Sequence, residues 1–139
     1  MGEYELIDHT ADIGIKLKAR DLSSLFVNSA AAMFDVIAPK KKTRKPFQGK
    51  NFIIHLEEDS LDELFMAWLR ELLSLADCED VIFTEFIITQ LTETELKANV
   101  TGSQRSHFHV IREIKAVTYH DLKVGQTGGM FKAEVIFDV

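Results

Sequence analysis

The sequence predicts a single α+β domain with two layers, in which two amphipathic helices cover one face of largely antiparallel β structure. Two segments with helical periodicity lie in the first half of the chain, segments with strand periodicity flank them, and strand signals alone follow residue 81. At 139 residues the chain has the length of one ordinary domain with a sizeable core. We therefore assign residues 1–139 to one domain.

The first half of the chain predicts two strand and helix pairs. Apolar and polar side chains alternate over residues 13–19 and again over 51–57, as in half-buried strands. After the first strand, Asp21 is placed to cap a helix whose apolar stripe ends before Pro39. After the second, Ser60 and Glu63 form a capping-box pattern in front of another apolar stripe. Both stripes are assigned to the core.

The second half predicts four strands, over residues 81–89, 96–101, 112–124 and 130–138. Residues 92–94 and 125–129 are predicted turns, and residues 102–109 a loop. His107 and His109 in that loop are interpreted as surface histidines, because no further metal ligand lies nearby in the sequence.

Composition limits where the protein works and which metals it can hold. The hydrophobic content of 46% is typical of globular proteins, no apolar segment approaches bilayer length, and the amino terminus does not resemble a signal peptide. We expect a cytoplasmic protein without a membrane partner. Cys78 is the only cysteine, which excludes an intramolecular disulfide and a cysteine-rich zinc site. A metal site must therefore use oxygen or imidazole.

The chain is acidic overall and has one basic segment. The net charge of −6 argues against autonomous, tight binding to a phosphate backbone. Residues 40–45 carry five of the 16 basic side chains, which leaves 11 basic against 22 acidic residues elsewhere. A solvated connecting loop is the favoured interpretation of this segment. A contact for RNA phosphate or for an acidic partner is the alternative.

The polar segment His9-Thr10-Ala11-Asp12-Ile13-Gly14 precedes the first predicted strand. Its side-chain oxygens suit a tight turn, but His9 and Asp12 are also suitable metal ligands. Asp138 stands at the other end of the chain, beside the terminal carboxylate of Val139. A solvated strand end and a ligand are both open interpretations of this carboxylate.

Five segments together resemble the archease family over essentially the full length of the chain. They are the segment at residues 9–14, Met33-Phe34-Asp35, Trp68-Leu69-Arg70-Glu71-Leu72-Leu73, Lys115-Ala116-Val117-Thr118-Tyr119-His120 and Val135-Ile136-Phe137-Asp138-Val139. The resemblance implies a cytoplasmic accessory protein, not itself an enzyme, that activates an RtcB-type RNA ligase in tRNA splicing and RNA repair. The ligase uses GTP and a divalent metal. The accessory protein promotes guanylylation of the ligase's active-site histidine and multiple turnover, and it contacts RNA only through the ligase.

The resemblance also implies functional residues. Asp12 and Asp138 correspond to the family's acidic, cation-binding residues, and Lys115 to its functional lysine. If the first and last strands are antiparallel neighbours, Asp12 and Asp138 meet, with the carboxylate of Val139 beside them. Oxygen ligands of this kind suit Mg²⁺, Ca²⁺ or Mn²⁺ better than zinc. His9 is expected either to orient a ligand or to bond to the backbone.

Two alternatives use the same residues differently. The first is a stand-alone metal-dependent phosphoester hydrolase built on the carboxylates, although the sequence carries none of the common phosphate-loop or hydrolase motifs. The second is a chaperone-like or nucleic-acid-binding adaptor that uses residues 40–45.

Overall fold

The computed structural model of the chain describes residues 4–8, 12–39 and 49–139. The regular elements, in chain order, are β1 (Tyr4–Asp8), β2 (Asp12–Ala19), α1 (Leu22–Ile37), β3 (Lys50–Glu57), α2 (Leu61–Glu79), β4 (Val81–Leu91), β5 (Glu95–Gln104), the short 3-10 helix η2 (Arg105–His107), β6 (Ala116–Thr127) and β7 (Met130–Asp138).

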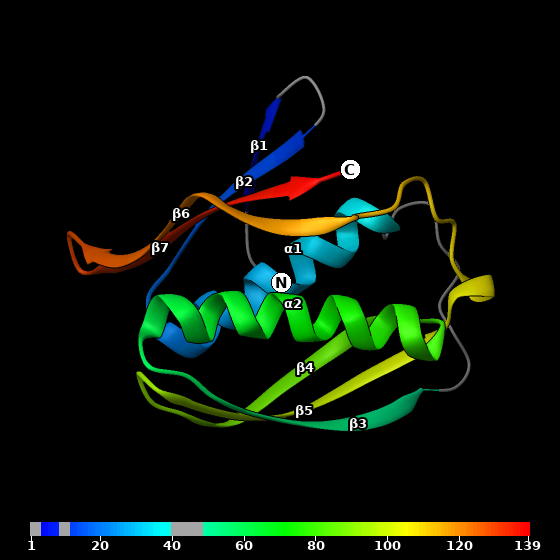
Figure 1. Cartoon of the computed structure of the whole chain (residues 1–139), viewed down its shortest axis with the longest axis horizontal. Coiled ribbons are helices and arrows are strands. Elements are labelled where there is room, and N and C mark those ends of the chain that lie inside the picture. Colours follow the sequence, from blue (N-terminus) through cyan, green and yellow to red (C-terminus); the bar gives the residue numbers. More distant parts are fainter. Residues whose placement is uncertain (1–3, 9–11, 40–48) are drawn as a thin grey trace.

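The strands form two antiparallel sheets with the helices between them. One sheet has four strands in the order β1-β2-β7-β6, and the other has three in the order β3-β5-β4. Figure 1 shows α1 and α2 running between the two sheets. The predicted α+β class with two helices and antiparallel strands is confirmed. The layer arrangement differs from the two-layer prediction, because each helix has a sheet on both sides.

The burial of the helices explains the third layer. Nine of the 16 residues of α1 are buried, more than a stripe facing a single sheet requires. This helix packs against β2 and β7 of one sheet and against β4 of the other, while α2 contacts β6 as well as β3 and β4. The apolar periodicity identified both helices but did not reveal that their flanks are covered too.

Aromatic side chains join the layers through the core. Phe26 of α1 and Phe65 of α2 meet edge to face with ring centroids 5.0 Å apart. Trp68 is fully buried, donates from its indole Nε1 to the carbonyl oxygen of Phe26 at 2.9 Å and lies edge-on to Phe86 of β4. Since aromatic pairs of this geometry add to the free energy of burial, these contacts hold the two helices against the three-stranded sheet.

Most predicted boundaries are confirmed, and the differences have local causes. Both helices begin where their caps predicted: the backbone amide of Ser24 donates to Asp21, and that of Glu63 donates to Ser60. Strand β1 was not predicted. Strand β5 continues to Gln104, through part of the predicted loop, and pairs with β4 there. A Cβ atom at Gly102 would lie 2.8 Å from the carbonyl oxygen of Ile82. Glycine here permits close approach of two strands rather than a turn.

The sixth strand differs from the prediction at both ends. It continues to Thr127, so the predicted turn at residues 125–129 shrinks to Gly128 and Gly129. It begins at Ala116 rather than at residue 112, and residues 108–115 form no regular element. The backbone amide of Ile111 donates instead to the carbonyl oxygen of Ile37, at the end of α1, at 2.9 Å. Arg112 likewise donates to the carbonyl oxygen of Val36 at 3.3 Å. Ile111, through its backbone amide, and Arg112, through its guanidinium group, thus bind the end of the helix, and pairing with β7 begins only near Lys115.

A polar contact between Tyr4 and Asp35 joins strand β1 to α1. The Tyr4 hydroxyl donates to Asp35 at 2.5 Å. Burial, and then the hydrogen bond to Asp35, raise the pKa of Tyr4 to about 12. Because this value lies above that of an unfolded tyrosine, the contact stabilises the protein fully below about pH 10, and the stabilisation is lost as the pH rises toward 12.

We expect Tyr4→Phe to lower the free energy of unfolding by about 1–2 kcal/mol at pH 8, since a hydrogen bond to a charged acceptor is lost. Between pH 10 and 12 the difference between the two proteins should shrink. In this range Tyr4 ionises in the unfolded wild-type chain but keeps its proton in the folded protein, so rising pH favours unfolding of the wild type only. Urea unfolding at pH 8 and pH 11.5 measures both effects. Equal pH slopes for the two proteins would contradict the role of this hydroxyl.

Candidate functional site

Asp12 and Asp138 lie directly opposite each other on neighbouring strands. Strands β2 and β7 are antiparallel, and their register pairs Asp12 with Asp138 and Ile13 with Phe137. Figure 1 shows the end of β7, near the label for the carboxyl terminus, beside β2. The predicted adjacency of Asp12 and Asp138 is therefore confirmed. The strand that the sequence predicted as first is the second in the chain, after β1.

The two aspartates share the outer face of the four-stranded sheet. In β7, the side chains of Ala133, Val135 and Phe137 are buried in the core. Because side chains alternate along a strand, Asp138 points the other way, away from the helices. Its directly paired neighbour Asp12 shares that face. Both residues are half-buried, so they are neither in the core nor fully solvated.

The third strand of this row brings in the segment of Lys115. Strand β6 pairs its first residue, Ala116, with Asp138. The backbone amide of Lys115 donates to the carbonyl oxygen of Asp138 at 2.7 Å, and the Lys115 side chain is exposed. The three predicted residues Asp12, Asp138 and Lys115 therefore lie together at one end of the strands of this sheet, although they are far apart in the sequence.

The end of β7 is held on both sides. Asp138 is paired with Asp12 on one side and with Ala116 on the other, and the half-buried side chain of Val139 packs against the core. Arg70 of α2 also donates to the carbonyl oxygen of Val117 at 3.3 Å, which ties the start of β6 to the helix. The alternative interpretation of Asp138 as a frayed strand end is contradicted.

The pairing of two carboxylates has an electrostatic consequence. Side chains directly opposite on antiparallel strands have Cβ atoms about 4.5–5.5 Å apart, and like charges in that position destabilise the sheet. A hard divalent cation removes this repulsion, because carboxylate oxygens are the ligands it prefers. The donor set at Asp12 and Asp138 thus fits such an ion, and Val139 follows it directly. Their role as metal ligands stays a prediction.

Two other predictions fall outside the described residues. His9, with Thr10 and Ala11, is not described, and neither is the basic segment 40–45. Their proposed roles therefore stay predictions as well. His107 and His109 are described, and both are exposed, as expected of surface histidines.

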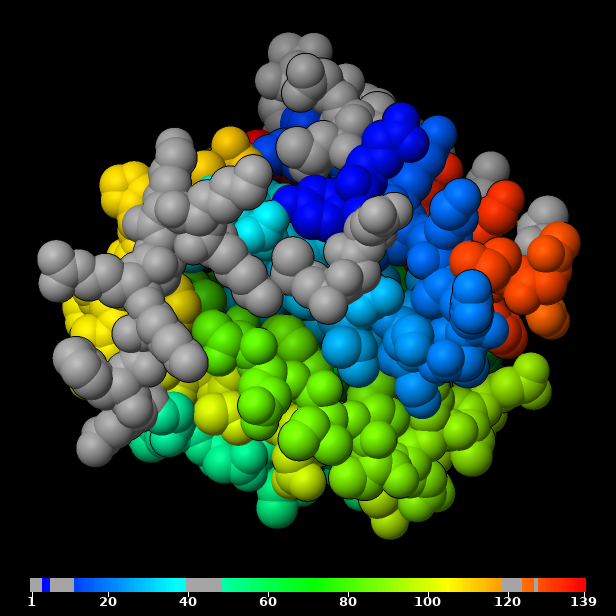
Figure 2. Space-filling view, turned by 180° about the vertical axis from the view of Figure 1, so that it is seen from behind, coloured from blue at the N-terminus to red at the C-terminus, as the bar shows by residue number. Residues whose placement is uncertain are grey.

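A groove of about 1040 Å³ lies at the other end of the four-stranded sheet. Figure 2 shows this side of the molecule, where β1, β2 and the start of α1, in blue, lie next to the β6–β7 hairpin, in orange and red. Lys16 lies opposite both Glu5 and Glu134, so its charge is balanced. Lys18 lies opposite Lys132. The lining also includes Arg20 and Asp21, so its basic and acidic side chains nearly balance, and we assign this groove no function.

Comparison with known proteins identifies the family. A model described as "Archease protein family (MTH1598/TM1083)" matches residues 4–139. The chain belongs to the archease family. It is 32% identical to "Protein archease" of Methanosarcina barkeri, over 99% of this chain and 96% of that protein. It is also 32% identical to "Protein archease" of Pyrococcus abyssi, over the full length of both. The predicted resemblance is thereby confirmed.

Solved structures of archeases share the fold. The solution structure of Methanobacterium thermoautotrophicum protein 1598 matches 98% of both chains with a TM-score of 0.74 and 29% sequence identity. The crystal structure of a Thermotoga maritima protein, described as "an archease, possible chaperone", matches 96% of this chain and 94% of its own with a TM-score of 0.62. At 23% identity the latter comparison supports the fold alone.

The archease relatives compared above are named as proteins of the family and not as enzymes. Among the described residues, neither α1 nor α2 combines the length and the apolar character that a bilayer-spanning helix requires.

Proposed function

We propose that this protein activates an RtcB-type RNA ligase, promoting guanylylation of the ligase and its multiple turnover in tRNA splicing and RNA repair. The observation that carries the proposal is the register of the four-stranded sheet, which places Asp12 opposite Asp138 and the segment of Lys115 beside them. These are the residues for which the archease resemblance implies function. Membership of the archease family over residues 4–139 supports the same role.

The residues at this end of the sheet have different proposed roles. Asp12 and Asp138 would hold a divalent cation, Mg²⁺, Ca²⁺ or Mn²⁺, with the carboxylate of Val139 beside them. The cation supplies positive charge near the ligase's GTP-dependent chemistry. The exposed Lys115 side chain is free to contact the partner, while its backbone amide fixes the end of β7. The protein itself transfers no group.

A turnover assay tests this function. The ligase is incubated with an excess of cleaved RNA, GTP and a divalent cation, with and without this protein, and joined RNA is measured per ligase molecule. We expect joining to stop near one RNA per ligase without the protein and to continue well beyond one with it. Equal yields in both reactions would overturn the proposal.

The same preparation separates the alternatives. Release of phosphate or nucleotide by this protein alone, without the ligase, would favour the hydrolase interpretation of Asp12 and Asp138. Salt-dependent RNA binding by the protein alone, lost when residues 40–45 are neutralised, would favour the adaptor interpretation. Under our proposal neither activity is observed.

A further inference from the structure

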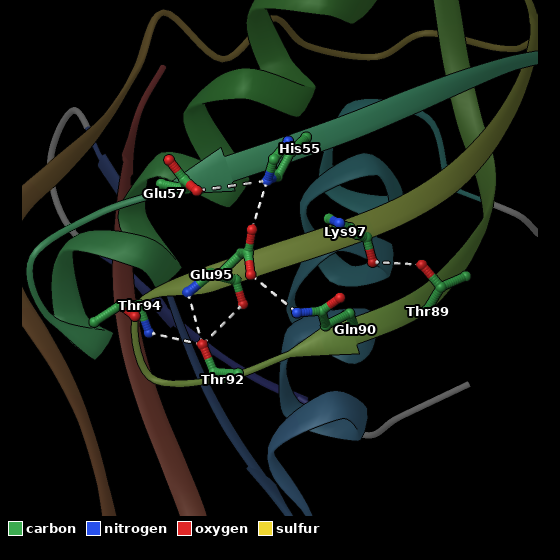
Figure 3. Close-up of polar contacts among 8 residues, drawn as sticks. All are labelled: His55, Glu57, Thr89, Gln90, Thr92, Thr94, Glu95 and Lys97. Carbon is green, nitrogen blue, oxygen red and sulfur yellow. Dashed lines mark hydrogen bonds and ion pairs between the residues drawn. The ribbon is translucent and has the colours of Figure 1, made fainter.

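A second group of metal-ligating side chains lies on the other sheet. His55 and Glu57 project from β3, and Glu95 projects from the start of β5. One ligand atom from each residue lies within 4.8 Å of those of the other two. Figure 3 shows the carboxylates of Glu57 and Glu95 directed toward the imidazole of His55. Because Asp12 and Asp138 belong to the four-stranded sheet, this group is separate from the site described above.

The backbone places these three residues with little freedom. His55 and Glu57 are two residues apart in one strand and therefore point to the same face. The register of β3 and β5 pairs Glu57 directly with Glu95. The turn before Glu95 is fixed by Thr92, whose hydroxyl oxygen accepts from the Glu95 amide at 2.9 Å and whose amide donates to the Glu95 carbonyl at 2.8 Å. The Glu58 amide donates to the Thr94 carbonyl at 2.9 Å, which ties the end of β3 to the same turn.

The separations are close to those of a metal centre. The Nε2 atom of His55 lies 2.8 Å from Oε2 of Glu95 and 3.9 Å from Oε1 of Glu57. Tetrahedral bonds of about 2.0–2.1 Å put neighbouring ligand atoms about 3.3 Å apart. The two separations from Nε2 of His55 therefore need to change by only about 0.5–0.6 Å, and the ligand atoms of Glu57 and Glu95 already lie within 4.8 Å of each other. Exposed side chains can accommodate such changes by small rotations.

The charges and hydrogen bonds of the cluster also suit a cation. Glu57 and Glu95 are like charges directly opposite each other, an arrangement that destabilises a sheet without a compensating positive group. The hydrogen bond from His55 lowers the pKa of Glu95. Gln90 donates to Oε1 of Glu95 at 2.9 Å, which orients Oε2 toward the imidazole. A carboxylate supported in this way is typical of metal ligands.

We propose that His55, Glu57 and Glu95 bind a divalent transition-metal ion, with Zn²⁺ the preferred probe and water in the fourth position. The ion takes the place of the hydrogen bond between Nε2 of His55 and Oε2 of Glu95. An imidazole with two carboxylates suits zinc and its first-row neighbours, whereas the oxygen ligands at Asp12 and Asp138 suit hard cations. The chain therefore carries two sites with different metal preferences. The positively charged side chain of Lys97, on the residue opposite His55, repels a metal ion and limits the affinity of the site for Zn²⁺.

Zinc titration of the full chain tests the site. Exposed Cys78 is a competing thiolate ligand, so all proteins carry Cys78→Ser. Metal is first removed with a chelator, and Zn²⁺ binding at pH 7.5 is followed by calorimetry. We expect one strong site, weakened roughly tenfold or more in His55→Ala and in Glu95→Gln, and about tenfold in Gln90→Ala. His107→Ala serves as the matched control, because this exposed histidine lies outside the cluster, and it should bind Zn²⁺ normally.

Two further measurements make the outcome decisive. Circular dichroism checks that each variant is folded, as expected for changes at exposed side chains. In ¹H–¹⁵N spectra of the imidazoles, Zn²⁺ should shift the ring of His55 but not that of His107. Unchanged affinity in His55→Ala and Glu95→Gln, absence of zinc binding, or equal displacement of Zn²⁺ by Mg²⁺ would each overturn the proposal.

Discussion

An Asp138→Asn variant is expected to fold normally and to lose the stimulation of RNA ligase turnover. The change keeps the size of the side chain and its place on the strand, but it removes a negative charge and an oxygen ligand from the pair with Asp12. Loss of a ligand should weaken cation binding by roughly 100-fold. Removing a residue that only hydrogen-bonds to a metal ligand already costs about 10- to 100-fold, and a ligand itself should cost at least as much. Asp12→Asn should have the same effect, and multiple turnover measures both.

The controls separate loss of the site from loss of charge or of fold. Asp59→Asn removes an exposed carboxylate near the start of α2, and it should leave stimulation unchanged. Under the proposal the two aspartates act on one cation, so the double variant Asp12→Asn with Asp138→Asn should lose little more than either single one. High concentrations of the divalent cation should partly restore the single variants. Full stimulation by both single variants would remove the site from the mechanism while leaving the zinc site at His55 untouched.

The second large effect is expected at Trp68. This side chain is fully buried, contacts Phe86 and donates a hydrogen bond to Phe26, so it connects both helices with the three-stranded sheet. Trp68→Ala should lower the free energy of unfolding by about 3–5 kcal/mol, since it leaves a large cavity. That is a large fraction of the stability of a typical domain and corresponds to a fall of about 10–15 °C in melting temperature.

A more conservative change divides this effect into its parts. Trp68→Phe keeps an aromatic ring against Phe86 but removes the indole donor and part of the volume, so it should cost clearly less than alanine. Thermal and urea unfolding followed by far-ultraviolet circular dichroism measures both variants, because the only tryptophan is lost as a fluorescence probe. Equal losses for phenylalanine and alanine would show that the hydrogen bond, not the packing, dominates at this position.

The local pattern predicted the helices well because their signals are local. The caps at Asp21 and Ser60 and the apolar repeats behind them act within a few residues, and both helices begin where these signals place them. Strand β1 escaped prediction because its five residues carry too short a pattern. Gly102 was misinterpreted because glycine marks both turns and close strand contacts, and only the neighbouring strand distinguishes the two.

The candidate sites depended on the sequence to different degrees. Asp12, Asp138 and Lys115 were chosen from the archease resemblance, and the structure brought their segments together in one row. The cluster of His55, Glu57 and Glu95 was not predicted. The alternation in β3 already put His55 and Glu57 on one face, but nothing local indicated that Glu95 would be their partner.

By itself the sequence determined the α+β class, the two helices, the acidic character and the archease family, because these follow from periodicity, composition and motifs along the chain. Tertiary structure alone decided that the helices lie between two sheets and that Asp12 faces Asp138. The reason is that strand register is set by long-range backbone pairing and by burial of a whole face, so residues distant in sequence become neighbours only when the sheet forms.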